Sequence, residues 1–351
     1  MNFRMIGQVI GRVLCIEAAL MLLPMVAALA YGETPAPFLI TIAVTGGIGL
    51  AMWRVRAKSG GMTARDGFLI VGLSWIAMSL FGALLFVLTG DIPNYIDALF
   101  ETISGLTTTG ASVVTSPESM TRGGMFWRLF THWIGGMGIL VFVLAVLPMS
   151  GNRSMHIMRA EVPGPTVGKL VPRIRKTASI LYLLYIALTL VETVLLIAGG
   201  MSFYDALLHA FATAGTGGLK VSRVMLLFKS CTIEVKKMLR PRCVENVRLD
   251  GKPVDGQTVY NAMTFFTFYI IILLIAGLIV SLDGLDFTTN FTAALSCLSN
   301  VGPGLSLVGP TGSFAIFSPL SKIVLMICML LGRLEIFPLL LLFVPFTWRW
   351  K

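Results

Sequence analysis

The sequence is poor in the residues that carry out chemistry. Charged residues make up 13% of its 351 residues, and it has only three histidines and five cysteines. The cysteines lack the paired spacing of a zinc site or a disulfide framework, so we expect them to be ordinary small apolar residues. His132 and His209 have no other metal ligands near them in sequence. No Ser/His/Asp set, phosphate-binding loop or dinucleotide-binding motif is present. These absences give no support to an enzymatic function, and we expect no cofactor.

The sequence is instead rich in long apolar runs. Hydrophobic residues make up 56% of the chain and its mean hydropathy is +0.86, outside the usual range of soluble proteins. A helix of about 20 residues spans the hydrocarbon core of a membrane. Apolar runs of this kind lie near 8–30, 37–55, 67–89, 125–149, 177–199, 259–281 and 321–347. The first run lacks a convincing signal-peptide cleavage site, so we expect it to be a retained helix.

Lysine and arginine fall into alternate connections between these runs. The basic connections are 54–65, 151–176 and 229–258. In the other connections Arg122 is the only lysine or arginine. These connections are 31–36, 90–124, 200–218 and 282–320. By the positive-inside rule, the basic connections and both termini are expected to be cytoplasmic. The net charge of +10 then reflects topology and not nucleic-acid binding. Contact of the polybasic segments with anionic membrane lipid is the open alternative.

Three of the outer connections contain a short helical segment followed by a turn. These turns, rich in Gly, Thr or Pro, lie at 106–112, 213–218 and 299–304. The short segments are too short to span the bilayer, so each is expected to enter the membrane halfway. Non-helical backbone at that depth must be buried or must line a water-filled path, where carbonyl oxygens can replace the hydration shell of an ion. Gly110, Gly217 and Gly302 hold the equivalent place in each unit. The pattern predicts an internal repeat that lines an ion path.

Each turn also has a simpler interpretation. Thr107, Thr108 and Thr109 could cap a helix end, although three threonines before a glycine favour an ion filter. Asn300–Gly304 alone would be an ordinary turn, and only its place after a short helix favours a filter. For Thr216–Gly218, a plain glycine linker and a filter remain equal alternatives.

Arg333 is a charge deep in the last apolar run, with Glu335 close by in sequence. An intramembrane charge marks a candidate functional site and needs a partner. A local ion pair is the structural alternative, but Gly332 beside the arginine permits close packing and favours a functional role. Arg12, Glu17 and Glu192 are expected to form interface or structural pairs.

Six motifs make the sequence similar to a known family. They are 100–112 (FETISGLTTTGAS), 133–138 (WIGGMG), 161–170 (EVPGPTVGKL), 209–218 (HAFATAGTGG), 300–304 (NVGPG) and 332–338 (GRLEIFP). The sequence resembles the TrkH/KtrB/HKT superfamily of potassium transporters, and within it the bacterial TrkH branch. The resemblance implies an all-α polytopic protein of the bacterial inner membrane, with four pore repeats around one potassium path. It also implies a leading helix pair, a homodimer and a cytosolic nucleotide-binding regulatory subunit called TrkA.

The resemblance assigns roles to particular residues. It implies potassium contacts at Thr108, Thr109, Gly110, Thr216, Gly217, Asn300, Val301 and Gly302. It places Arg333 below the filter, where it would take part in gating. Potassium is then the bound and transported ion. The preference for K⁺ over Na⁺ and the coupling to another ion stay open.

The sequence departs from the four-repeat pattern because a third filter is absent. Residues 219–229 are similar to the inner half of the third repeat's last helix, so the preceding pore region is expected to be missing. A long in-frame deletion with its join inside 215–218 explains this, and an assembly error in the sequence would look the same. The expected organisation is a leading helix pair at 1–60, a first pore repeat at 61–150, a basic loop and partial second repeat at 151–218, a third-repeat remnant and basic segment at 219–258, and a fourth pore repeat at 259–351.

Two functions follow from these observations. The chain is either the pore-forming transmembrane subunit of a Trk-type potassium-uptake system, or an internally deleted, non-conducting remnant of one. The missing third filter decides between them, because three repeats leave one side of a pore unlined unless a partner subunit fills it.

Overall fold

The computed structural model describes residues 3–55, 64–138, 174–214, 232, 248–249, 252–253 and 256–334. Within these residues the helices are joined by loops, and the strands are one antiparallel pair of two residues each, β1 at Arg248–Leu249 and β2 at Lys252–Pro253. The expected all-α class is therefore confirmed. Short 3₁₀ helices lie at Pro117–Ser119, Ser281–Asp283, Ser306–Val308 and Phe314–Ile316. The turn at 215–218 and the half-helix after it lie outside the described residues.

The long helices have the length and composition of membrane spans. In the described part of the chain, four stretches are long and apolar enough to cross a membrane, namely Phe3–Ala30, Ala36–Arg54, Asp66–Thr89 and Ala262–Asp283. They contain α1 (Phe3–Leu20) with α2 (Leu22–Ala30), α3 (Ala36–Arg54), α4 (Ala64–Thr89) and α12 (Gly256–Val280). These helices match four of the expected runs, which shows that apolar length alone located them.

Three expected runs are only partly tested. Helix α9 (Ile174–Ala198) covers the run at 177–199, although its apolar stretch Tyr182–Ala198 is short for a span. Helices α6 (Arg122–Met137) and α14 (Pro319–Arg333) cover the first parts of the runs at 125–149 and 321–347. The remainder of both runs lies outside the described residues.

The first expected span, 8–30, is confirmed within the stretch Phe3–Ala30, but its helix is interrupted. It divides at Met21 into α1 and α2. The cause is Pro24, which has no N–H to donate to the carbonyl of Leu20 one turn earlier. Helix α1 also packs closely on α3, since a Cβ atom at Gly11 would lie 2.6 Å from the carbonyl oxygen of Gly49. Small residues at such crossings let membrane helices approach closely.

The three short helices predicted from the repeat pattern are present. They are α5 (Tyr95–Leu106), α10 (Phe203–Ala214) and α13 (Phe287–Ser299), of 12, 12 and 13 residues. At 1.5 Å per residue each is about 18–20 Å long, well short of the roughly 30 Å hydrocarbon core. Side-chain caps start two of them: Asn94 accepts from the backbone N–H of Ile96, and Asp286 from that of Thr289. Each short helix therefore ends partway through the bundle.

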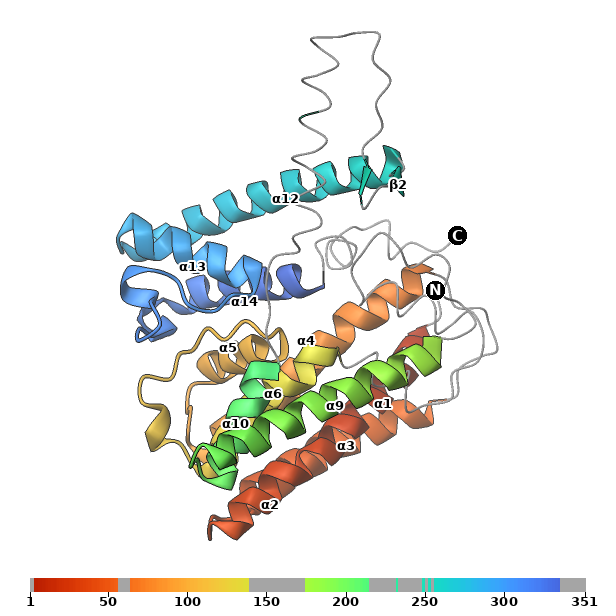
Figure 1. Ribbon diagram of the computed structural model, residues 1–351, viewed down its shortest axis with the longest axis vertical. Coiled ribbons are helices and arrows are strands. Elements are labelled where there is room, and N and C mark those ends of the chain that lie inside the picture. The colour runs from red at the N-terminus through yellow and green to blue at the C-terminus, as the bar shows by residue number, and fades with distance from the viewer. Residues whose placement is uncertain are drawn as a thin grey trace.

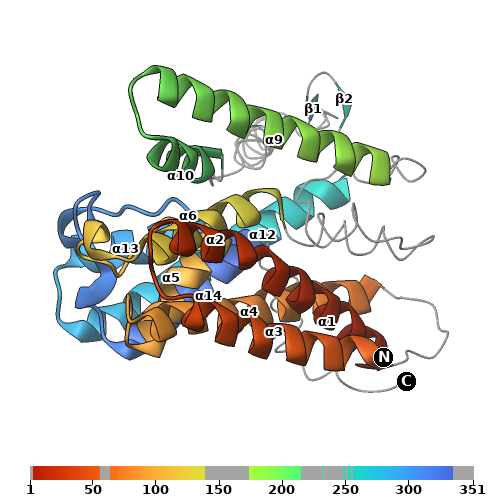
Figure 2. The ribbon, with the colours of Figure 1, turned by 90° about the horizontal axis from the view of Figure 1, so that it is seen from below.

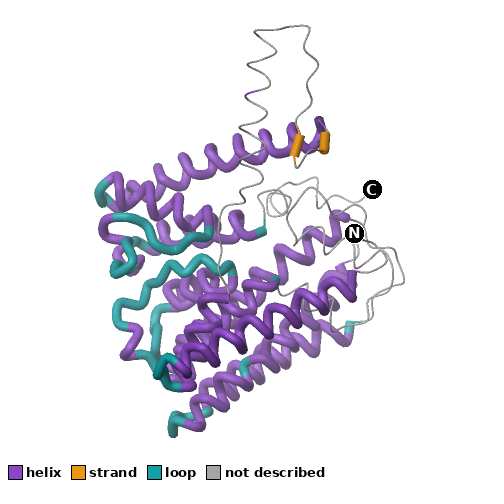
Figure 3. Tube along the Cα trace, viewed as in Figure 1, coloured by secondary structure: helices purple, strands orange, loops and turns teal. Residues whose placement is uncertain are grey.

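The helices pack side by side, with α4, α5 and α6 between two other groups (Figure 1). Helices α1 and α3 pack against α4 on one side, and α14 packs against α5 on the other. Helix α10 lies on α6 and α9, as the second view also shows (Figure 2). Most of the described loops gather at one end of the bundle (Figure 3). The loops that follow α5 and α13 are thereby brought to the same region.

Candidate ion-binding site

The turn after α5 has a strained backbone and a buried hydroxyl chain. Thr108 has φ 58° and Gly110 has φ 82°, and only glycine adopts such values freely. The Thr107 hydroxyl donates to the carbonyl of Ile103 at 2.7 Å, and the hydroxyl oxygens of Thr107 and Thr109 are 2.7 Å apart. Because the Thr107 proton is used on Ile103, Thr109 donates to Thr107. Thr107 thus caps the helix, as its simpler interpretation held, whereas Thr108 lies beyond the helix end.

The turn after α13 repeats this backbone pattern. Asn300 has φ 53° and Gly302 has φ 98°, with one residue between them, as at Thr108 and Gly110. Asparagine is one of the few residues with a side chain that visits the left-handed region routinely. Asn300 is buried, while the side chain of Val301 is half exposed. The equivalence of Gly110 and Gly302 inferred from sequence therefore has a conformational basis.

The two turns lie against each other, although 191 residues separate them. The Asn300 amide donates from Nδ2 to the Thr109 hydroxyl at 2.8 Å and to the Met329 carbonyl at 3.0 Å. A Cβ atom at residue 302 would lie only 2.4 Å from the carbonyl oxygen of Thr109, so only glycine fits there. The structure thus brings together Thr109, Asn300 and Gly302, three of the residues predicted to contact the ion.

The same helix-packing arrangement supports both turns. A Cβ atom at Gly135 of α6 would lie 1.9 Å from the carbonyl oxygen of Leu106, the last residue of α5. A Cβ atom at Gly332 of α14 would lie 2.2 Å from the carbonyl oxygen of Leu298, the equivalent residue of α13. Helix α6 therefore approaches the end of α5 through a glycine, and α14 approaches the end of α13 in the same way.

The electrostatics around the two turns favour a cation. The carboxyl-terminal ends of α5 and α13 meet here, and each helix end carries about half a negative elementary charge. Two cationic side chains that contact α5 are each paired: Arg128 with Glu101, and Lys322 with Asp97, both at 2.5 Å.

Buried oxygen atoms at this site lack partners. Within the described residues, the hydroxyl oxygens of Thr108 and Ser104 are buried and have no hydrogen-bond partner. A buried polar atom without a partner is costly, so these two hydroxyls fit the role of cation ligands. The described residues contain no group of three or more His, Cys, Asp or Glu that could hold a metal ion. The donors available are hydroxyl and carbonyl oxygens, which suit an alkali cation.

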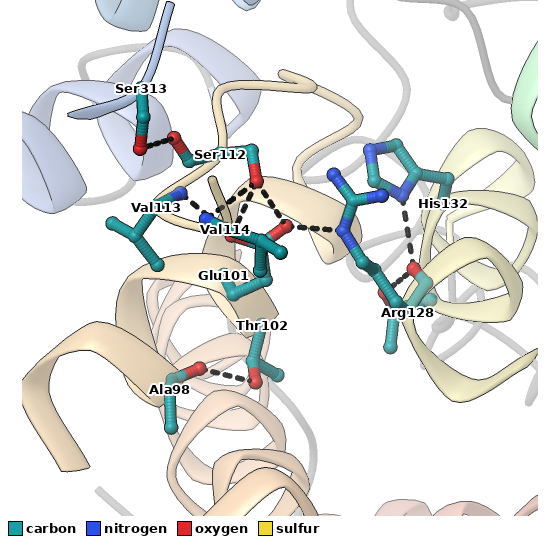
Figure 4. A network of polar contacts seen from close by, with 10 residues as sticks. Ala98, Glu101, Thr102, Ser112, Val113, Val114, Arg128, His132 and Ser313 are labelled. Carbon is teal, nitrogen blue, oxygen red and sulfur yellow. Dashed lines mark hydrogen bonds and ion pairs between the residues drawn. The ribbon is translucent and has the colours of Figure 1, made fainter. Parts of the chain in front are cut away.

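A second polar network holds the chain just beyond Gly110 (Figure 4). The Glu101 carboxylate accepts from Nε of Arg128 at 2.5 Å, from the Ser112 hydroxyl at 3.1 Å and from the backbone N–H of Val113 at 3.0 Å. The Ser112 carbonyl accepts from the backbone N–H of Phe314 at 2.8 Å, which ties the first unit to the outer loop of the last. Sequence analysis missed Glu101, Arg128 and Lys322. The presence of Arg128 inside an apolar run was the available signal.

Arg333 lies at the carboxyl-terminal end of α6. Its Nη2 donates to the Gly135 carbonyl and, at 3.3 Å, to the Gly136 carbonyl. Its guanidinium lies over the Trp75 ring, 5.8 Å from the centroid. A cation at a helix carboxyl terminus is favourable, and the stacking adds to it. Glu335, its expected neighbour, lies outside the described residues.

The second unit is described only as far as the end of its short helix. Phe211 of α10 packs against Phe130 and Trp133 of α6, with ring centroids 5.3 and 5.7 Å away. Thr216 and Gly217, the predicted ion contacts of this unit, lie outside the described residues. The structure therefore places α10 beside the first unit and leaves its turn untested.

Comparison with known proteins gives one family over almost the whole chain. The family model described as TrkH, cation transport protein, matches residues 36–214 and 209–349. The Trk system potassium uptake protein TrkH of Escherichia coli K12 is 28% identical, over 99% of this chain and 100% of the relative, as is that of Salmonella typhimurium. The crystal structure of the potassium transporter TrkH from Vibrio parahaemolyticus superposes with a TM-score of 0.83 at 26% identity, over 99% of this chain and 100% of the other.

The same comparisons bear on the missing repeat. The alignment with the E. coli protein runs over 485 positions, whereas this chain has 351 residues, so at least 134 positions have no residue here. The two segments matched by the family model overlap at 209–214. The unmatched positions agree with an internal deletion, and the overlap lies just before the expected join at 215–218.

Proposed function

The chain belongs to the TrkH family of cation transport proteins, and we propose that it is the pore-forming transmembrane subunit of a potassium-uptake system. Potassium is the bound and transported ion. Relatives named as Trk system potassium uptake proteins align with the chain from end to end and favour this function over that of a non-conducting remnant.

One observation carries the proposal: the two left-handed turns, at Thr108–Gly110 and Asn300–Gly302, lie against each other at the ends of two short helices. A cation that enters there loses its water and needs oxygen ligands in return. The unpartnered Thr108 hydroxyl and the carbonyls of Thr109, Gly110, Asn300, Val301 and Gly302 would supply them. Thr216 and Gly217 would complete the set from the second unit.

Several structural features explain how the residues of this site could act. The Thr109 hydroxyl is already used between Asn300 and Thr107, so Thr109 would meet the ion through its carbonyl. The two helix ends lower the energy of a dehydrated cation before any ligand is counted. Arg333, below the turns on the carbonyls of α6, would regulate passage by moving relative to α6.

The remaining parts of the proposal concern the assembly. A second copy of the chain would flank the side where the third unit is missing, and a cytosolic nucleotide-binding subunit of the TrkA type would regulate transport. The protein would lie in the bacterial inner membrane with both termini in the cytoplasm. The first and fourth pore repeats, at 61–150 and 259–351, would each line one side of the path.

Growth at limiting potassium tests the proposal. A bacterium without its own potassium-uptake systems should grow at low potassium when it expresses this 351-residue form, and its rubidium uptake should rise with the amount of protein in the membrane. Membrane-inserted protein that restores neither growth nor uptake would favour the non-conducting remnant.

A further inference from the structure

Glu101 binds the chain on both sides of the first filter turn. It lies in α5, while Ser112 and Val113, which donate to its carboxylate, follow the turn. Its third partner, Arg128, comes from α6. The side chain is 2% exposed, so this network is screened from water. A buried carboxylate is stable only when paired and fully hydrogen-bonded, and charge-assisted bonds of this kind are roughly twice as strong as neutral ones.

The contacts close the turn into a loop of fixed size. The strained residues Thr108 and Gly110 lie between the two points that Glu101 holds. The Ser112 hydroxyl also accepts from the backbone N–H of Val114 at 3.0 Å, so the segment after the turn is held at three successive residues. A displacement of Ser112 would be transmitted to Phe314 of the last unit through its carbonyl.

The other two units have no such carboxylate. When Gly110 is aligned with Gly217 and Gly302, the residues equivalent to Glu101 are Leu208 and Ala293, both buried and apolar. The fourth unit instead holds its turn through a hydroxyl, since the backbone N–H of Leu305 donates to Thr292 at 2.9 Å. Between the two units whose turns are described, the first thus fixes its turn with a buried charge and the fourth with a hydroxyl.

We propose that Glu101 is a positioning residue for cation selectivity: through Ser112 and Val113 it holds the Thr108–Gly110 oxygens at the spacing that fits a potassium-sized ion. This inference rests on the proposed function of that turn as a potassium contact. Glu101 does not touch the ion. Loss of its contacts would let the turn relax and fit sodium and potassium more equally.

The experiment compares four variants with the wild type. Glu101→Gln removes the charge at equal size, and Ser112→Ala removes one link while leaving the ion pair with Arg128 intact. The double variant Glu101→Gln with Arg128→Gln restores charge balance but not the strong acceptor for Ser112 and Val113. Asp205→Asn is the matched control, because this exposed carboxylate starts another short helix, 3.9 Å from Arg122.

Purified protein in detergent is titrated with rubidium chloride and with sodium chloride, and the rise in thermal unfolding midpoint gives the apparent affinity for each ion. We expect the rubidium preference to fall roughly tenfold or more in Glu101→Gln and Ser112→Ala, the usual effect of losing a hydrogen bond to a charged group. Asp205→Asn should keep it. The double variant should recover thermal stability without recovering the preference. If Glu101→Gln does not fold, Ser112→Ala decides.

An unchanged preference in Ser112→Ala, or its full recovery in the double variant, would show that Glu101 only stabilises the fold. Absence of rubidium-specific stabilisation in the wild type would also overturn the inference, since no ion site would then be held. Rubidium flux into vesicles is measured separately. Selective stabilisation without flux would refute the transport function while leaving the positioning role in place.

Discussion

The side-chain amide of Asn300 donates to the hydroxyl of Thr109 at 2.8 Å and joins two turns that lie 191 residues apart in the sequence. From Thr109 the chain of donors continues to Thr107 and then to the Ile103 carbonyl. Hydrogen bonds in series strengthen one another in a buried environment. The turn after α13 is therefore linked through Thr109 and Thr107 to α5, the helix that precedes the turn at 107–110.

Replacement of Asn300 should separate the stability that its side-chain amide contributes from the stability that its left-handed backbone contributes. Asn300→Gly keeps the left-handed backbone but removes both amide bonds, so the free energy of unfolding should fall by about 1–3 kcal/mol. Asn300→Ala should cost about 1–2 kcal/mol more, because alanine resists positive φ. Denaturation of the purified protein in detergent measures both. Equal stability of the two variants would contradict the left-handed conformation at this position.

Gly302 should tolerate no side chain. A Cβ atom there would lie 2.4 Å from the Thr109 carbonyl oxygen, so Gly302→Ala should abolish rubidium uptake into proteoliposomes. Gly32→Ala is the matched control, since Gly32 has φ 76° but nothing within 4 Å of the added atom. Both variants share a backbone cost of about 1 kcal/mol. Uptake equal to the control in Gly302→Ala would show that the two turns are not in contact.

Substitution of Gly110 tests the backbone conformation of the turn, because an added side chain there meets no steric clash. Its φ is 82° and an added Cβ atom would meet nothing within 4 Å, and the same is true of Gly90 in an outer connection. Gly110→Ser should lower the preference for rubidium over sodium, whereas Gly90→Ser should cost similar stability and leave the preference unchanged. Competition between the two ions in uptake gives the ratio. If both variants keep the wild-type ratio, the turn at 107–110 is only a helix cap.

Arg333 should affect the rate of transport more than its selectivity. Arg333→Gln loses the charge that binds the Gly135 and Gly136 carbonyls and stacks on Trp75. We expect an altered rubidium flux with an unchanged rubidium-to-sodium ratio. Arg122→Gln is the control, because Arg122 is exposed and also stacks on aromatic rings. A flux equal to that of the control would show that Arg333 has no role in gating.

The orientation of the chain can be measured by cysteine labelling. Cysteines introduced at positions 240 and 310 should react with a membrane-impermeant reagent from opposite sides, because the connection around residue 240 is basic and that around residue 310 is not. Labelling of both positions from outside the cell would overturn the topology.

The sequence predicted local features well and long-range contacts poorly. The lengths of α5, α10 and α13 followed from short apolar segments beside Gly-rich turns, and the equivalence of Gly110 and Gly302 followed from their place after these segments. The break at Met21 was predictable from Pro24, since proline removes a donor. The Asn300–Thr109 and Lys322–Asp97 contacts join residues 191 and 225 positions apart, and no periodicity in one sequence records such a distance. Glu101 was missed because a carboxylate within a short helix resembles an ordinary surface charge until Arg128 and Ser112 are placed beside it.

Ion flux through the purified protein tests the central claim most directly, namely that the turns at 108–110 and 300–302 form a potassium path in this 351-residue chain. Purified protein is reconstituted into liposomes loaded with potassium. The outward potassium gradient then drives the uptake of radioactive rubidium, which is measured over time. The account predicts rubidium uptake well above that of protein-free liposomes, inhibited by external potassium more strongly than by equal sodium, and lost in Gly302→Ala. Uptake no faster than in protein-free liposomes, or unaffected by Gly302→Ala, would contradict it.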